Sequence, residues 1–94
     1  MLSQIPLDLS KVKKEDIDKE IMRIGMMAEL DAVNLYEQLA ATAQSEDLKK
    51  ALIDIAKEEK THIGEFEALL LANDPEQVSE NTKAQEEIKK ILSK

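Results

Sequence analysis

Two long stretches of the chain carry apolar side chains at the spacing of an α-helix that buries one face. In residues 46–72 these positions advance in alternating steps of four and three residues, the heptad-like pattern of a helix packed along a partner helix. The positions on this line are Leu48, Leu52, Ile55, Glu59, His62, Phe66 and Leu69. A matching line in residues 13–43 consists of Met22, Met26, Glu29, Val33, Tyr36, Ala40 and Ala43. The pattern predicts an all-α protein built on an antiparallel two-helix hairpin.

The ends of the two predicted helices follow from residues that cap or break a helix. Gln44 and Ser45 separate the two apolar lines. Ser45 is placed to cap the second helix, because Glu46 and Asp47 after it would lie at the positive end of the helix dipole. Within the first helix only Gly25 disfavours helix formation, at a cost of about 1 kcal/mol relative to alanine. We therefore expect the chain to reverse near Ser45.

The remaining segments show weaker patterns. Asp74 followed by Pro75 is typical of a helix start and predicts a short turn. Residues 82–92 are weakly amphipathic and are predicted to form a short C-terminal helix. Residues 1–12 show no sustained period and are predicted to be an extended lead-in. Because the chain has 94 residues and no internal repeat, we expect residues 1–94 to form a single domain.

Composition and charge exclude several classes of protein. The chain carries 13 basic and 20 acidic residues, and its net charge of −7 argues against a nucleic-acid partner and favours cationic ligands. It has no cysteine, which excludes disulfides, zinc ribbons, iron–sulfur clusters and thiol catalysis. No apolar run approaches the ~18 residues of a membrane span, and the N-terminus lacks the apolar stretch of a signal peptide. We therefore expect a soluble cytoplasmic protein without a membrane partner.

Three polar residues interrupt the two apolar lines near the middle of the helices. Glu29 lies on the first line, and Glu59 and His62 lie on the second, where an unpaired carboxylate would be costly. Glu29 precedes Ser45 by 16 residues (45 − 29), while Glu59 and His62 follow it by 14 (59 − 45) and 17 (62 − 45). At a rise of ~1.5 Å per residue, all three reach a level roughly 24 Å from the turn. The spacing predicts that they converge in one layer of the hairpin and face inward.

Two carboxylates and one imidazole in one layer form half of a known type of metal site. Di-iron carboxylate bundles use two single glutamates and two Glu-x-x-His pairs, drawn from four helices. Here Glu59 and His62 supply one such pair, and Glu29 supplies one single glutamate. Two copies of the hairpin would complete both the four-helix bundle and the six-ligand site. These donors suit Fe(II), Mn(II) or Zn(II). Taken alone, His62 has an ordinary alternative role as a core histidine that forms hydrogen bonds.

Residues around these three candidates have less specific roles. Tyr36 lies two turns beyond Glu29 on the same line, where it is either core filler or a hydrogen-bond donor to a ligand carboxylate. Glu58 and Glu65 are predicted to be flanking or peripheral. The first helix also carries a second apolar line, which one partner helix cannot cover, so we expect contacts with more than one other subunit. This second line consists of Ile17, Ile21, Ile24, Ala28 and Leu35.

The stretch Met27–Glu37, followed by Glu58–His62, resembles the encapsulated ferritins. The resemblance covers roughly residues 14–75 and implies a ferritin-like four-helix bundle in which a ferroxidase centre with two iron ions forms between two chains. It further implies an annular decamer of five dimers, housed inside an encapsulin nanocompartment in the cytoplasm. At the matching positions it implies the iron ligands Glu29, Glu59 and His62, with Tyr36 near the centre.

The chain departs from the family pattern at several positions. The family often has an acid immediately before the ligand glutamate, where this chain has Ala28, and a tryptophan before the tyrosine, where it has Leu35. An acidic residue two positions after the ligand is kept as Asp31. The resemblance associates these positions with a secondary metal site. Asp31 is the candidate residue for such a site in this chain. The usual shell-targeting tail has no clear counterpart in residues 88–94.

The leading functional prediction is a ferroxidase that oxidises Fe(II) to Fe(III) with O2 for iron storage in the shell. The first alternative is a non-enzymatic helical assembly protein whose site holds a structural divalent metal such as Zn(II). The second is a rubrerythrin-like protein that reduces peroxide at a di-iron site. The absence of a cysteine-ligated iron domain weakens this second alternative without excluding it.

Overall fold

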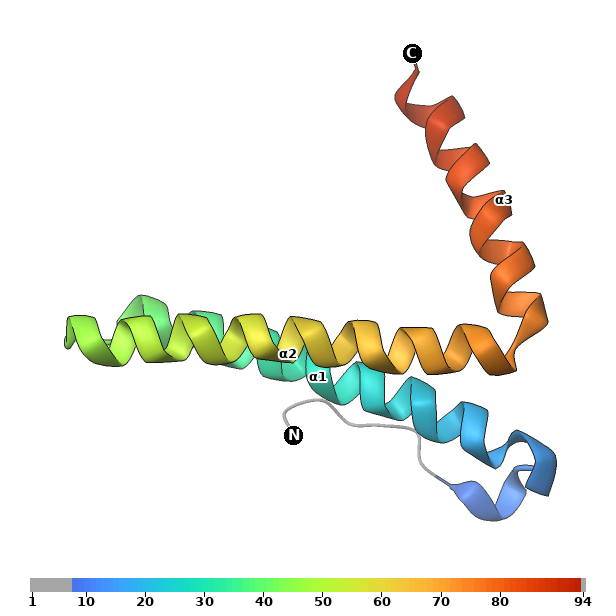
Figure 1. The fold of residues 1–94 in the computed structure, drawn as a ribbon, viewed down its shortest axis with the longest axis horizontal. Helices are drawn as coiled ribbons and strands as arrows, with labels where there is room; N and C mark the ends of the chain where they lie inside the picture. The colour runs from blue at the N-terminus through green and yellow to red at the C-terminus, as the bar shows by residue number, and fades with distance from the viewer. Residues whose placement is uncertain (1–7, 94) are drawn as a thin grey trace.

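The structure, a computed structural model, describes residues 8–93, and these form helices and turns without a β-strand. Helix α1 spans Ile17–Thr42, α2 spans Glu46–Asn73 and α3 spans Pro75–Leu92. Helices α1 and α2 pack against each other as an antiparallel hairpin, and α3 leaves the far end of α2 at a steep angle (Figure 1). The prediction of an all-α hairpin is confirmed. None of the helices in residues 8–93 is long and apolar enough to cross a bilayer.

The reversal between α1 and α2 lies at the predicted place. Ala43 ends α1 in an extended conformation, with φ −66° and ψ 136°. The hydroxyl oxygen of Ser45 accepts a hydrogen bond from the backbone N–H of Leu48 at 3.2 Å, which caps α2. Glu46 and Asp47 occupy the first turn of α2, where their charges favour the helix dipole. This short connection keeps α2 close to α1 along its length.

The predicted start of the C-terminal helix was wrong, because α3 begins at Pro75 rather than at residue 82. A carboxylate oxygen of Asp74 accepts a hydrogen bond from the backbone N–H of Gln77 at 3.1 Å and caps the new helix. Pro75 follows at the first position, where a missing N–H costs nothing. Gln77 then donates a side-chain hydrogen bond to Asn81 one turn later, at 2.8 Å. The cap therefore starts one continuous helix where the sequence predicted a turn and a separate shorter helix.

The N-terminal segment differs in part from the predicted extended lead-in. Residues 1–7 lie outside the described part of the chain. Leu9–Lys11 forms a 3₁₀ turn, in which the Asp8 carboxylate accepts a hydrogen bond from the backbone N–H of Ser10 at 3.2 Å. A second 3₁₀ turn, Lys14–Asp16, leads directly into α1. Capping by Asp8 explains why this short segment turns instead of remaining extended.

The hairpin has a narrow core because two helices cover only one face of each other. The buried apolar residues of the described part are Val33, Ala40, Ala56 and Leu70. Many larger apolar side chains remain exposed on all three helices: Ile21, Met27, Leu30, Leu39, Leu48, Ile53, Leu69, Val78, Ile88, Ile91 and Leu92. The Cα radius of gyration is 16.9 Å, against about 12 Å for a compact domain of this length. The extended shape and the exposed apolar surface differ from those of a compact, self-contained globule.

Candidate metal centre

Glu29 on α1 and Glu59 and His62 on α2 meet at mid-height of the hairpin. The Nδ1 atom of His62 lies 3.5 Å from Oε2 of Glu29 and 3.4 Å from Oε2 of Glu59. One ligand atom from each of the three residues lies within 4.8 Å of the others. The structure thus brings together the three residues that interrupt the apolar lines of the sequence. Within residues 8–93 this is the one group of three acidic or histidine side chains spaced to hold a metal ion.

The distances between the three side chains suit coordination of a shared divalent cation better than direct hydrogen bonds. Separations of 3.4 and 3.5 Å are long for N–H···O hydrogen bonds. Ligands at about 2.1 Å from a tetrahedral metal ion are about 3.4 Å apart, close to the separations found here. The Oε2 atom of Glu29 is buried and accepts no hydrogen bond in the described part of the chain. A buried carboxylate oxygen without a donor costs free energy unless a cation compensates it.

The cluster is enclosed on one side only. The side chains of Glu29 and Glu59 are 21% and 19% exposed, whereas that of His62 is 46% exposed. A hollow of about 330 Å³ opens beside them, lined by Glu29, His62, Glu65, Phe66 and Leu69. Three protein ligands fill fewer than the four to six positions of a common divalent ion. An ion bound here would therefore need further ligands from water or from another chain.

Other candidate residues of the sequence lie outside this cluster. Tyr36 is partly buried on α1 and is not a member of the group of three. Asp31 is partly buried on the same helix and is not a member of the group. Glu58 is exposed, in agreement with its predicted flanking position. Glu65 is exposed as well, but it lines the hollow beside His62, a proximity that follows from its place one turn along the α2 face.

An ion pair near the cluster was not identified from the sequence. Lys60 Nζ on α2 lies 3.3 Å from Oε2 of Glu37 on α1. Both side chains are more than half exposed, so the pair contributes little to stability. Lys60 lies between Glu59 and His62 in the sequence, and its side chain extends toward Glu37 on the neighbouring helix. The sequence shows both charges, but only the rotation of the two helices decides that they meet.

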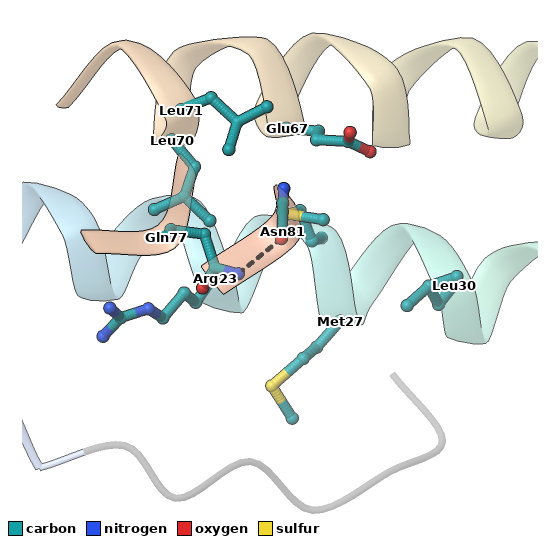
Figure 2. A pocket seen from close by; sticks show the side chains of 9 residues that line it. Arg23, Met27, Leu30, Glu67, Leu70, Leu71, Gln77 and Asn81 are labelled. Atoms are coloured by element: carbon teal, nitrogen blue, oxygen red, sulfur yellow. Dashed lines mark hydrogen bonds between the residues drawn. The ribbon is translucent and has the colours of Figure 1, made fainter. Parts of the chain in front are cut away.

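A larger hollow lies at the elbow between α2 and α3. It has a volume of about 450 Å³ and is lined mainly by methionine and leucine side chains of the hairpin and by the first turns of α3 (Figure 2). Figure 2 shows the hydrogen bond between Gln77 and Asn81 on its α3 wall. Arg23 lines the hollow, but its guanidinium already binds Asp74 and Glu20. This hollow carries no group of metal-binding side chains, so the cluster on the hairpin remains the candidate site.

A helix hairpin with facing carboxylates and one imidazole belongs to the ferritin-like class of helical proteins. A family model described as Rubrerythrin matches residues 20–93. The chain belongs to this family and, within it, to the encapsulated ferritins.

Solved and curated relatives agree with this assignment. The crystal structure of the encapsulated ferritin domain from Pyrococcus furiosus superposes with a TM-score of 0.83 at 45% identity, covering 100% of this chain and 98% of that one. The ferritin-like-encapsulin shell fusion protein of Pyrococcus furiosus is 49% identical over an alignment of 94 positions, which covers 97% of this chain and 27% of that protein. The encapsulin nanocompartment cargo protein EncC of Myxococcus xanthus is 34% identical over 87 residues, covering 89% of this chain and 67% of that protein. The chain thus spans about a quarter of the fusion protein.

Proposed function

We propose that this chain is a ferroxidase subunit that binds Fe(II) as its substrate between two copies of the hairpin and oxidises it to Fe(III) with O2. The observation that carries the proposal is the buried Oε2 of Glu29, which faces Glu59 and His62 without a hydrogen-bond donor. Two carboxylates and one imidazole are donors that suit Fe(II). The group also lies on the open side of the hairpin, where a second chain has access to it.

A second copy supplies what a single chain lacks. A two-fold axis beside His62 places another Glu29, Glu59 and His62 against the first set, which gives six ligands for two ions. In this arrangement Glu29, Glu59 and His62 of both chains would hold the two ions, with the carboxylates shared between the ions and one His62 for each ion. The accessible surface of the chain supports such an assembly, because it is 7416 Å² against about 5500 Å² for a compact monomer of this mass. The excess, roughly 1900 Å² per chain, is larger than the roughly 800 Å² that one partner contributes to an interface of standard size.

In the reaction each of two Fe(II) ions gives up one electron, and O2 takes up these two electrons and two protons from solvent to leave as hydrogen peroxide, so the site must remain partly accessible. The carboxylates favour the more highly charged Fe(III) product, since they offset its added positive charge. The product then leaves for storage as a ferric mineral. The net charge of −7 raises the local concentration of Fe(II) around the subunit.

The names of the relatives support a nanocompartment as the setting. One relative is a fusion of a ferritin-like domain with an encapsulin shell, and another is an encapsulin cargo protein. We propose that this chain likewise works inside an encapsulin shell in the cytoplasm, as a ring of ten subunits. Its exposed apolar residues on α1 and α3 leave surface for contacts beyond the metal-binding dimer.

Aerobic addition of Fe(II) tests the proposal. Wild-type protein should accelerate the rise in ferric absorbance over the rate in buffer, and the Glu29→Gln variant should lose most of this acceleration. Loading with Zn(II) should inhibit the reaction by occupying the same ligands. Retention of Zn(II) without any catalysed oxidation of Fe(II) would instead establish a structural metal site. Oxidation that needs peroxide and does not proceed with O2 would establish the peroxide-reducing alternative.

A further inference from the structure

Gly25 on α1 and Phe66 on α2 make the closest approach that the structure records for a glycine. A Cβ atom at position 25 would lie 2.6 Å from both Cε1 and Cζ of the Phe66 ring and 2.9 Å from Cδ1. Non-bonded carbon atoms prefer separations of about 3.5–4.0 Å. The ring therefore occupies space that any other residue at position 25 would fill. This contact gives a physical reason for a glycine in the interior of α1, where it costs about 1 kcal/mol of helix propensity.

The contact lies one helical turn from the metal-binding cluster on both helices. Gly25 precedes Glu29 by four residues (29 − 25), and Phe66 follows His62 by four (66 − 62), so each pair shares a helix face. Phe66 also lines the hollow of about 330 Å³ that opens beside Glu29 and His62. The ring is thus both a spacer between the helices and a wall of the site.

We infer that Gly25 and Phe66 are positioning residues that set the separation of Glu29 from His62, an inference that rests on the proposed function. The 3.5 Å between Oε2 of Glu29 and Nδ1 of His62 joins two helices, so it depends on how closely α1 approaches α2. The 3.4 Å between Glu59 and His62 joins two residues of α2 and is independent of that approach. A change in helix spacing therefore alters one edge of the ligand triangle and leaves another unchanged.

Adding a methyl group at position 25 forces one of two movements. The Phe66 ring moves into the hollow, where it approaches Glu29 and His62, or α1 moves away from α2 and the distance between these two residues increases. Either movement disturbs the metal-binding geometry. Gly64, by contrast, lies on α2 with no heavy atom within 4 Å of the position that a Cβ would take. The same glycine-to-alanine change at position 64 is therefore a matched control.

Co(II) is a suitable probe, because its visible absorption reports coordination geometry without turnover. Wild type and four variants are titrated anaerobically with Co(II), and their helix content is checked by circular dichroism. The variants are Gly25→Ala, Gly64→Ala, Phe66→Leu and the double variant G25A/F66L. We expect Gly25→Ala to bind Co(II) about tenfold more weakly, with an altered visible spectrum, as is typical when support for a metal ligand is lost. Gly64→Ala should behave as wild type. The double variant should recover affinity, because leucine vacates the space that the added methyl group needs.

The outcomes separate this inference from the proposed function. Co(II) binding by the wild type with an unchanged affinity and spectrum in Gly25→Ala would overturn the inference alone. Equal losses in Gly25→Ala and Gly64→Ala, or no recovery in the double variant, would overturn it too. A wild type that binds no Co(II), Fe(II) or Zn(II) would overturn both. If Gly25→Ala does not fold, Phe66→Leu decides the matter: weaker binding with an altered spectrum supports the inference, and wild-type behaviour overturns it.

Discussion

The guanidinium of Arg23 on α1 donates a hydrogen bond at 3.0 Å to the carboxylate of Asp74, a residue 51 positions later at the elbow between α2 and α3. The other carboxylate oxygen of Asp74 accepts the hydrogen bond from Gln77 that caps α3. Asp74 is also the one buried polar residue of the described part of the chain. This single side chain therefore joins the start of α3 to the hairpin and holds the elbow in its bent geometry (Figure 1).

Two substitutions of Asp74 should destabilise the elbow between α2 and α3 to different degrees. Asp74→Ala removes both the cap and the partner of Arg23, and should lower the free energy of unfolding by about 2 kcal/mol. Asp74→Asn keeps a capping oxygen and should cost about half as much, because Arg23 is half exposed and its charge is screened. Urea unfolding followed by circular dichroism measures both, with Glu76→Ala as the control for an exposed acid in the same turn. An equal free energy of unfolding for Asp74→Ala and wild type would contradict the role of Asp74 in holding the elbow.

Removal of the candidate ligands should strongly slow iron oxidation without unfolding the hairpin. Glu29→Ala, Glu59→Ala and His62→Ala should each slow the ferric absorbance change at least about tenfold, because each removes a direct donor to the substrate. Glu65→Ala is the matched control, since Glu65 is exposed and lies one turn from the site on the same helix. It should have a small effect. A comparable loss in Glu65→Ala would show that a ligand comes from the hollow rather than from the apolar line that contains Glu59 and His62.

The level at which the site forms could be predicted from the sequence because helix geometry is almost invariant. A fixed rise per residue and a short reversal at Ser45 bring Glu29 opposite Glu59 and His62 whatever the other side chains are. The continuous α3 could not be predicted in the same way. Residues 79–82 favour helices only weakly, and the decision rests on the cap that Asp74 provides upstream.

Two contacts between elements could not be predicted from the sequence either. One joins Gly25 to Phe66, and the other joins Arg23 to Asp74. Each depends on the rotation and separation of two elements rather than on spacing within one helix. A pattern of apolar positions shows which face of a helix is buried, but it contains no measure of how closely two helices approach. From the sequence, Gly25 could be interpreted only as a residue that disfavours the helix. In the structure it provides space for the ring of Phe66.

The stoichiometry of metal binding should be one tight ion per chain. In the proposed dimer each chain contributes one set of Glu29, Glu59 and His62, so two chains would hold two ions. Anaerobic titration with Fe(II), followed by metal analysis of the protein after removal of unbound ions, measures the ratio. Saturation at two tight ions per chain would mean that a complete two-metal site forms within one hairpin, and the dimer would not be needed.

Metal binding should also promote the association of subunits. Without metal, a dimer joined at this site must bring two Glu29 and two Glu59 carboxylates together in a partly desolvated layer. Like charges there repel each other, or some of the carboxylates must take up protons, and either penalty weakens the interface. Two divalent cations bring four positive charges to these four carboxylates, so metal binding and dimerisation are linked by mass action.

Light scattering across an anaerobic Fe(II) titration measures this linkage through the mass of the particle. Wild type at micromolar concentration and neutral pH should increase in mass as Fe(II) is added. Glu29→Gln should associate more strongly than wild type without metal, since it removes one carboxylate per chain from the layer, yet respond less to Fe(II), since an amide is a poorer ligand. Glu65→Gln, which removes the same charge outside the cluster, should follow wild type in both respects. An equal oligomeric mass for metal-free and iron-loaded wild type would show that apolar contacts alone join the subunits, and an equal monomeric mass would contradict the proposed dimer.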